Sequence, residues 1–387
     1  MAVILLQAAG AALGGAFGPL GAALGQAAGA LAGSLIDSRL FASSRTIHGR
    51  SLSSVRIPSA EDGTPIARVQ GSARVNGTLI WATRFEESVT VERAGGKAGG
   101  GTKVESYSYS GNFAFGLCEG PVALVRRVWA DGRELDLSTL EMRLHRGTDN
   151  QMPDPLIEAK QGEGHTPAWR GLAYVVFERL PLDDFGNRIP VFNFEVVRPV
   201  GDLENRIEAV TCIPGGTEHG YALTVVSETP RRGEQRLINR NSLRGASDWT
   251  VSIDELQALC PNLKTVALVT AWMGTDLRAG ECVFVPGVEV AARNSERPSW
   301  RVGNCTRSTA RLISRTDGHP AYGGTPSDAS VIEAITDLKA RGLEVVLYPF
   351  VLMDVPAGNE LPDPYGGDEQ PPLPWRGRIT CYPAPGR

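Results

Sequence analysis

The first 36 residues contain no charged side chain, and this feature constrains the chain more than any other. They comprise 12 Ala, 8 Gly and 12 larger apolar residues, and the remainder are Gln7, Pro19, Gln26 and Ser34. Residues four apart share one side of a helix, so glycines at that spacing predict a smooth strip where another backbone can pack closely. Two series have this spacing: Gly10, Gly14 and Gly18, then Gly21, Gly25, Gly29 and Gly33. We therefore expect helices that lie in apolar surroundings or against copies of themselves.

Three other structures are possible for this segment: a secretory signal, a membrane span and a tail without regular structure. A secretory signal begins with a positively charged region, and no Lys or Arg precedes Asp37. A membrane span has enough residues here, but only a third of them are larger apolar side chains, and Pro19 divides the segment. A tail without regular structure stays open, because each glycine weakens an isolated helix by about 1 kcal/mol. A pair of helical segments packed in an oligomer is the preferred interpretation.

The composition narrows the functional classes. The chain has 387 residues, enough for about two or three domains, and its net charge of -4 provides no general nucleic-acid-binding surface. The 45 glycines and 26 prolines indicate a turn-rich β architecture. The five His and six Cys form neither a Cys-x-x-Cys nor a His-Glu-x-x-His motif. We therefore expect reduced thiols, with no metal site and no cofactor.

Residues 66–200 show the alternation of apolar and polar side chains that is typical of half-buried strands. The longest alternating run covers residues 107–117. Asn76-Gly77 and Asp131-Gly132 each separate two such runs, which predicts two β-hairpins. These patterns indicate antiparallel β domains of barrel or sandwich type. Residues 201–260 are expected to add a short helix at 203–210 and a strand at 221–227.

The pattern changes from about residue 261 onward. Residues 263–271 and 343–353 are nearly continuous apolar runs, typical of parallel strands buried on both faces. Between them, Ser327 begins a predicted helix that ends near Arg341, before Gly342. Two parallel strands with one helix cannot close a domain. Residues 261–387 are therefore interpreted as the start of an α/β, TIM-barrel-like unit that is incomplete here.

Two sets of residues are candidates for a phosphate-binding or a catalytic site. Residues 94–103 are rich in glycine, but Thr102 precedes Lys103, the wrong order for a phosphate-binding loop. Lys97 and Lys103 remain candidates for contact with passing DNA phosphates. Asp276 and Asp354 each follow an apolar strand of the α/β unit, where barrel enzymes place catalytic groups, and a carboxylate pair can cleave glycosidic bonds. Hydrolysis stays a minority interpretation, because barrel folds also occur without activity.

Several stretches resemble a known family. The strongest are residues 169–178 (WRGLAYVVFE), 182–190 (LDDFGNRIP) and 194–197 (FEVV). They resemble tail-tip hub proteins of long-tailed phages, most of all the large "megatron" tail-tip protein of α-proteobacterial gene transfer agents. Supporting stretches are residues 71–81, 107–110, 117–121, 128–132, 323–328, 348–350, 361–365 and 374–377. The resemblance covers nearly the whole chain. The family's polypeptide is longer, so its barrel domain and receptor-facing regions lie largely outside the resemblance.

The resemblance implies a homotrimeric hub at the distal end of the tail of a virion or gene-transfer-agent particle. Its β domains would close the tail tube and contact a hexameric distal tail protein, beside other tail-tip proteins. The apolar N-terminal segments would form a gate in the DNA channel and contact the host membrane during delivery. The seven glycines named above would then pack the gate helices. No catalytic residue is implied.

The combined expectation is an α+β chain, mainly antiparallel β hub domains with an apolar helical N-terminus and a partial α/β barrel-like unit. The expected segments are 1–36 (plug or gate), 37–65 (linker), 66–200 (β hub), 201–260 (mixed connection) and 261–387 (incomplete barrel-like unit). A glycan-cleaving enzyme that uses Asp276 and Asp354 is the first alternative. A membrane-anchored surface protein is the second.

Overall fold

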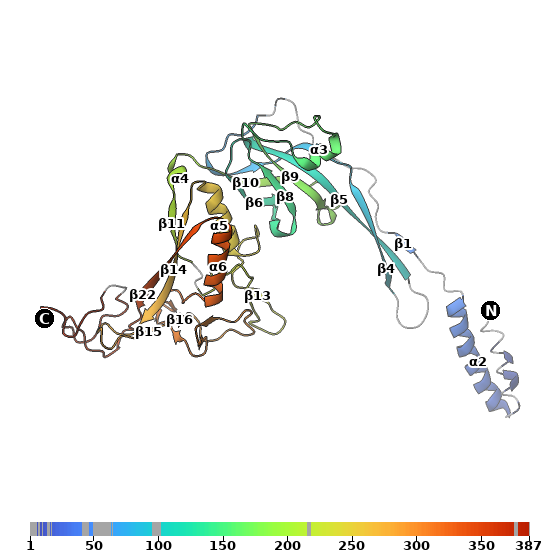
Figure 1. Cartoon of the computed structure of the whole chain (residues 1–387). Coiled ribbons are helices and arrows are strands. Elements are labelled where there is room, and N and C mark those ends of the chain that lie inside the picture. The colour runs from blue at the N-terminus through green and yellow to red at the C-terminus, as the bar shows by residue number, and fades with distance from the viewer. Residues whose placement is uncertain are drawn as a thin grey trace. The chain divides into compact units, whose positions relative to one another are not determined.

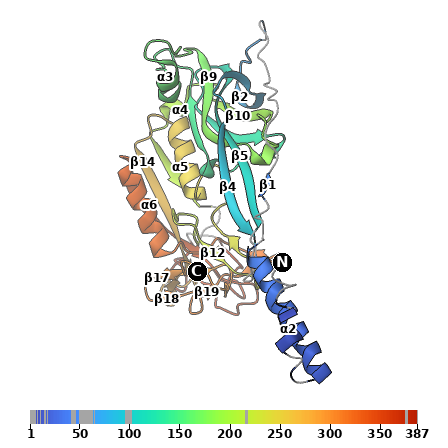
Figure 2. The same cartoon turned by 90° about the vertical axis from the view of Figure 1, so that its right-hand side faces the viewer.

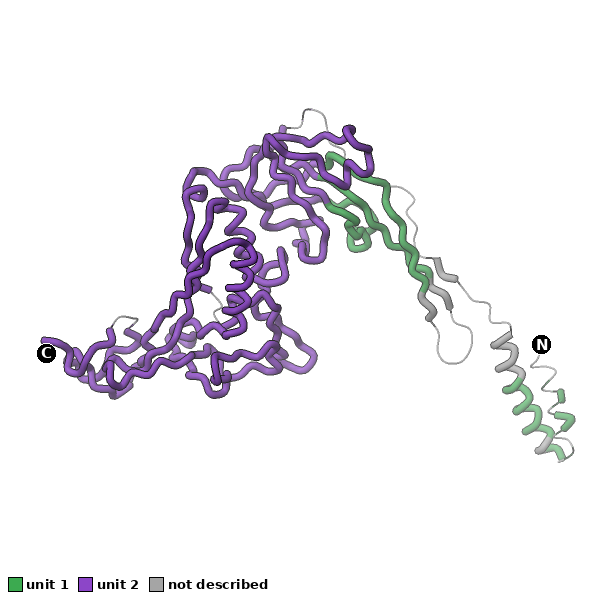
Figure 3. The backbone as a smooth tube through the Cα atoms, viewed as in Figure 1, with its two compact units in different colours: residues 1–61, 79–114, 177–190 green, residues 62–78, 115–176, 191–387 purple. Residues whose placement is uncertain are grey.

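The computed structural model of the chain describes residues 6, 8–9, 11–13, 16, 18–40, 46–48, 63, 65–94, 102–214, 218–374 and 378–386. The chain divides into two compact units, which Figure 3 distinguishes by colour. Unit 1 comprises residues 1–61, 79–114 and 177–190. Unit 2 comprises residues 62–78, 115–176 and 191–387. The domain boundaries expected from the sequence stay a prediction.

Most of the regular structure is antiparallel β, with a few helices, which is consistent with an α+β chain. The larger sheet has six strands in the order β1-β5-β9-β8, and β3 and β4 also pair with β5. These strands are β1 (Thr46–His48), β3 (Thr78–Ala82), β4 (Glu86–Ala94), β5 (Thr102–Glu119), β8 (Glu141–His145) and β9 (Leu172–Pro181). The strands expected near residues 107–117, 142–146 and 172–178 are thus confirmed.

A second sheet of four strands follows the order β2-β10-β6-β7. Its strands are β2 (Gly71–Asn76), β6 (Leu124–Ala130), β7 (Arg133–Glu134) and β10 (Phe192–Arg198). The predicted hairpin at Asp131-Gly132 is confirmed, because Ala130 pairs with Arg133 across these two residues. Asp131 and Gly132 have φ angles of 48° and 82°, the left-handed conformation that a two-residue hairpin turn requires.

The hairpin predicted at Asn76-Gly77 is wrong. Strand β2 pairs with β10, whereas β3 pairs with β5, so the two flanking strands belong to different sheets. The Gly77 N–H donates to the carbonyl of Phe192. A Cβ at Gly77 would lie 2.5 Å from the Phe194 ring. Position 77 therefore requires glycine because its backbone lies close to the Phe194 ring, rather than because the chain makes a hairpin turn there.

The α/β part of unit 2 is built on three parallel strands, β11 (Ala209–Cys212), β14 (Thr265–Gly274) and β22 (Glu344–Met353). Helices α5 (Asp248–Leu259) and α6 (Asp328–Ala340) run beside this sheet in Figures 1 and 2. Their buried side chains share one apolar core with the strands: Trp249, Ile253, Val266, Leu268, Ala334 and Leu338. Ser327 accepts a hydrogen bond from the Ser330 amide and caps α6, as the sequence predicted.

Four details of this part differ from expectation. The helix expected at 203–210 is limited to α4 (Leu203–Arg206), and β11 begins at Ala209. Residues 221–226 form no strand, because Asn239 and Glu333 side chains bind the amides of Leu223, Thr224 and Val226. Strand β22 is exposed in its first half. Fourth, β15 (Phe284–Val285) joins the sheet antiparallel. Among the described residues the sheet does not close into a barrel, so the incomplete barrel-like unit stays a prediction.

Short elements complete the description. Helix α3 (Pro155–Gln161) and the 3-10 turns η2 (Leu137–Thr139) and η3 (Asp183–Phe185) lie in the antiparallel β region. Two-residue strands form small ribbons in the loops of the α/β part: β12 (Ser227–Glu228), β13 (Arg236–Leu237), β16 (Gly287–Val288), β17 (Arg301–Val302), β18 (Cys305–Thr306), β19 (Arg311–Leu312), β20 (Arg315–Thr316) and β21 (His319–Pro320). These loops hold the buried charges described below.

Candidate functional site

The apolar N-terminal segment contains a long helix, α2 (Gly18–Leu40). It begins beside Pro19, a residue well suited to the first turn because its missing N–H needs no partner there. Gly18 has a φ of 86° and therefore begins the helix in a left-handed conformation. The second glycine series lies inside α2 as predicted: Gly21, Gly25, Gly29 and Gly33. Gly10 and Gly14 lie outside the described residues.

Helix α2 has 23 residues and is therefore about 35 Å long. Leu24 and Leu31, which extend from it, are 65% and 69% exposed. Both side chains are therefore available for contact with another apolar surface. None of the described helices combines the length and hydropathy that a membrane crossing needs.

Strands β4 and β5 form a long antiparallel hairpin in unit 1 (Figure 1). Their pairing extends from Glu86–Ser110 to Ala94–Thr102, and every described β4 side chain from Glu86 to Val91 is exposed. Lys97 lies outside the described residues. Lys103 is in β5, at the end of the hairpin that carries the glycine-rich loop. Contact of these two lysines with DNA stays a prediction.

The carboxylates of Asp276 and Asp354 follow two adjacent parallel strands, since Gly274 of β14 pairs with Met353 of β22. This placement agrees with the sequence. Both carboxylates are buried and bonded: Asp276 accepts from Arg278 and Gln370, and Asp354 accepts from Arg311 Nε at 2.5 Å and from the Ser314 amide. They therefore bind loop residues at the carboxyl ends of β14 and β22.

The pKa of Asp276 is shifted in the direction opposite to that of a glycoside-cleaving general acid. Burial raises the pKa of Asp276, but the hydrogen bonds and charge of Arg278, with the Gln370 amide, outweigh burial and lower that pKa overall. A general acid for glycosidic oxygen needs a raised pKa, so that it keeps its proton near neutral pH. The second carboxylate, Asp354, is engaged in an ion pair with Arg311. The glycan-cleaving alternative gains no support from this edge.

A second cluster of acidic groups lies in the loops of the α/β part and was not anticipated. Oxygen or nitrogen atoms of Glu218, His219 and Glu296 lie within 4.8 Å of one another, a spacing compatible with a metal ion. The guanidinium of Arg307 already occupies this space. It donates to Glu296 Oε1 at 2.5 Å and to Glu218 Oε1 at 3.0 Å. Arg293 lies 3.5 Å from Glu218 and 3.2 Å from Glu228.

The charges in this cluster compensate one another. Burial alone would raise the pKa of Glu296, but hydrogen bonds from His219, Arg307 and the Trp300 amide lower it to about 2. A bound cation would have to displace Arg307 from both carboxylates, so the donor set fits an ion-pair network better than a metal site. The residues come from segments 78 positions apart, between Glu218 and Glu296, so local spacing carried no signal for them.

Asp154 forms a third buried ionic group. Its carboxylate caps α3 by accepting from the Leu156 and Ile157 amides, and it also accepts from Arg143 and contacts His145 Nε2 at 2.9 Å. These hydrogen bonds and charges lower the pKa of Asp154 against the opposing effect of burial. The His145 ring stacks on Tyr174, with ring centroids 4.3 Å apart. Asp154 therefore caps α3 and connects it to Arg143 and His145 of strand β8.

Comparison with known proteins gives a match among the solved structures. No protein-family model and none of the characterised proteins compared with the chain matches it. Among solved structures, a chain in the "Virion of native gene transfer agent (GTA) particle" is 41% identical to it. The match covers 51% of this chain and 39% of that chain, so this chain spans well under half of its length. The TM-score is 0.30, so the agreement lies in the sequence and says nothing of a shared fold.

Proposed function

We propose that this chain is a structural protein of a phage-like DNA delivery particle, and specifically a hub at the distal end of the tail. The observation that carries the proposal is sequence agreement with a gene transfer agent virion chain, 41% identical over half of this chain. The stretches that resemble tail-tip hubs include strand residues of the buried core. Residues 173–177 and Phe194 are fully buried, so this resemblance includes residues on which folding depends.

The proposed oligomer is a homotrimer whose α2 helices pack around a common axis. The glycines at 21, 25, 29 and 33 would bring these helices close together. Exposed leucines on α2 and the exposed hairpin of β4 and β5 supply further surface for contact between copies or with a hexameric distal tail protein. In this arrangement the helices gate the DNA channel, Lys97 and Lys103 meet DNA phosphates, and the helices contact the host membrane on delivery.

The buried carboxylates also support a structural role. Asp154, Asp276, Glu296 and Asp354 are each held by an arginine and by further donors. Buried carboxylates that are paired with arginines in this way stabilise loops and helix ends. We further propose that strand β22, which pairs with β14 and has an exposed first half, continues into a larger barrel-like domain.

Electron microscopy of purified particles tests the proposal directly. A tag on this chain should locate three copies at the distal end of the tail. A monomeric chain that is absent from particles would refute the proposal.

The gate is tested by the paired substitution Gly25→Leu and Gly29→Leu. The added side chains should prevent close helix packing, so particles should leak DNA or lose most of their DNA delivery. Ala23→Leu with Ala27→Leu is the matched control, because these exposed residues have the same spacing on another side of α2. Equal delivery by both paired variants would remove the gate from the proposal.

A further inference from the structure

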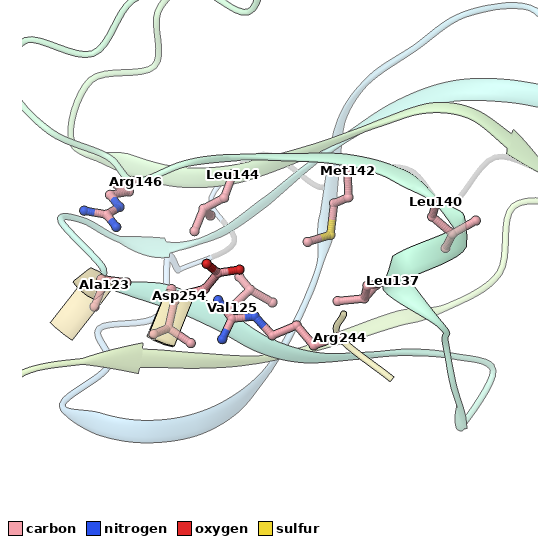
Figure 4. A pocket seen from close by; sticks show the side chains of 11 residues that line it. Ala123, Val125, Leu137, Leu140, Met142, Leu144, Arg146, Arg244 and Asp254 are labelled. Carbon is pink, nitrogen blue, oxygen red and sulfur yellow. The ribbon is translucent and has the colours of Figure 1, made fainter. Parts of the chain in front are cut away.

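Unit 2 contains a cavity of about 410 Å³ that none of the sites above uses. Its walls come from β6, β8, the turn η2 and helix α5, and Figure 4 shows its side chains. The apolar lining includes Val125, Leu137, Leu140, Met142 and Leu144. The volume is within the usual range for ligand pockets. These five side chains could contact an apolar group of a ligand, beside the polar part of the lining.

Three charged residues complete the lining: Arg146, Arg244 and Asp254. Arg244 is more buried than Arg146, and its side chain is 18% exposed. Burial lowers the pKa of Arg244 despite the nearby negative charges of Glu255 and Asp254. A buried guanidinium whose charge is poorly compensated is costly, and it favours an anion beside it.

The neighbouring carboxylates are already engaged by other arginines. Glu255 pairs closely with Arg126 through Oε1, and its other oxygen lies 3.5 Å from Arg244. Asp254 Oδ1 accepts from Arg341 Nη1 at 2.7 Å. Arg126 and Arg341 therefore lie closer to these two carboxylates than Arg244 lies to Glu255, and the positive charge of Arg244 is only partly compensated.

Arg146 adds a second positive charge at the pocket. It is exposed, and among the described residues its guanidinium forms no ion pair. Apolar walls between two guanidinium groups complement a carboxylate that is carried next to large apolar groups. The lining has no aromatic ring on which a nucleic-acid base could stack.

We propose that this pocket binds a segment of a partner protein that presents an acidic side chain beside a leucine-like one. The Asp254 side chain, which is 48% exposed, favours a peptide over a fatty acid, because it can accept a backbone N–H that only a peptide offers. Met142 is an adaptable side chain and suits a contact surface that adjusts to its partner. The inference goes beyond the hub function and does not depend on it.

The test is a titration of the full chain, labelled with carbon-13 at its methionine methyl groups. The probe is the peptide acetyl-Ala-Leu-Glu-Leu-Ala-amide, and its matched control has Gln in place of Glu. The Glu peptide should shift the Met142 methyl signal and saturate. The Gln peptide should bind at least about tenfold more weakly, because charge-assisted hydrogen bonds are about twice as strong as neutral ones. Equal affinities, or no shift of Met142 by either peptide, would overturn the proposal.

Variants connect the binding to the two arginines. Arg244→Gln should remove most of the preference for the Glu peptide, and Arg146→Gln should reduce it in part. Arg231→Gln is the control, because Arg231 is exposed on a loop that does not line the pocket. If Arg244→Gln perturbs the fold, seen as changed methyl signals without peptide, the exposed Arg146→Gln variant decides.

Sodium laurate is titrated in parallel. Binding of laurate without binding of the Glu peptide would identify a lipid site and refute the peptide proposal.

Discussion

Two regions of unit 2 hold distant segments together by different means. In the antiparallel β region, the rings of Phe115, Phe192 and Phe194 pack together with centroids 4.7 to 6.2 Å apart. In the loops of the α/β part, Glu218 and Glu296 are joined through Arg307. Apolar packing tolerates small changes of shape at small cost, whereas a buried ion network loses much of its stability when one member is removed.

The largest expected effect breaks the ionic region. Arg307→Met leaves Glu218 and Glu296 buried without their shared cation, and should lower the free energy of unfolding by about 3–5 kcal/mol. Denaturant unfolding followed by circular dichroism measures this. Arg301→Met is the control, because Arg301 lies on nearby β17 but is exposed. A loss below about 1 kcal/mol would mean that Arg293 alone can compensate both carboxylates.

The same region should respond to acid through Glu296. Its folded-state pKa of about 2 is below the ordinary value of 4.5, so the ionised form stabilises the fold above pH 4.5. That stabilisation is lost as pH falls toward 2, by about 2 kcal/mol between pH 7 and pH 3. The parent chain should therefore lose about 2 kcal/mol more over this range than Glu296→Gln, measured by denaturant unfolding at both pH values. Identical pH profiles would contradict the low pKa.

The aromatic region should show a smaller effect. Phe194→Leu keeps most of the buried volume, so we expect a loss of about 1–2 kcal/mol from a small cavity and lost ring contacts. The loss should be the same at pH 7 and pH 3, in contrast to the ionic region. Val191→Ala, at an exposed position just before β10, serves as the control and should change little. A strong pH dependence for Phe194→Leu would erase the distinction between the two regions.

Local signals in the sequence predicted a large part of the fold. Ser327 began a helix, Asp131-Gly132 formed a hairpin turn, and the apolar runs near 263–271 and 343–353 became parallel strands. Each depends on side chains within a few residues of one another. The same reasoning failed at Asn76-Gly77, because a turn signal does not specify which sheet receives the next strand.

The candidate site was less predictable. The sequence placed Asp276 and Asp354 at the ends of adjacent strands, and the structure agrees. Asp276 is bound by the nearby Arg278, whereas Asp354 is bound by Arg311, which lies 43 residues earlier in the chain. The ionic cluster around Arg307 and the pocket beside Arg244 were not foreseen. Their members are far apart in the chain, and burial decides their charge balance.

The sequence by itself determined the type and approximate position of most elements, and it placed four glycines on an apolar helix. Periodicity, capping and turn chemistry are local, so they can be read without a fold. Only the tertiary structure decided which strands share a sheet, which carboxylates are already paired and where an arginine is left with little compensation. Those outcomes depend on which distant segments meet and on how much water their contact removes.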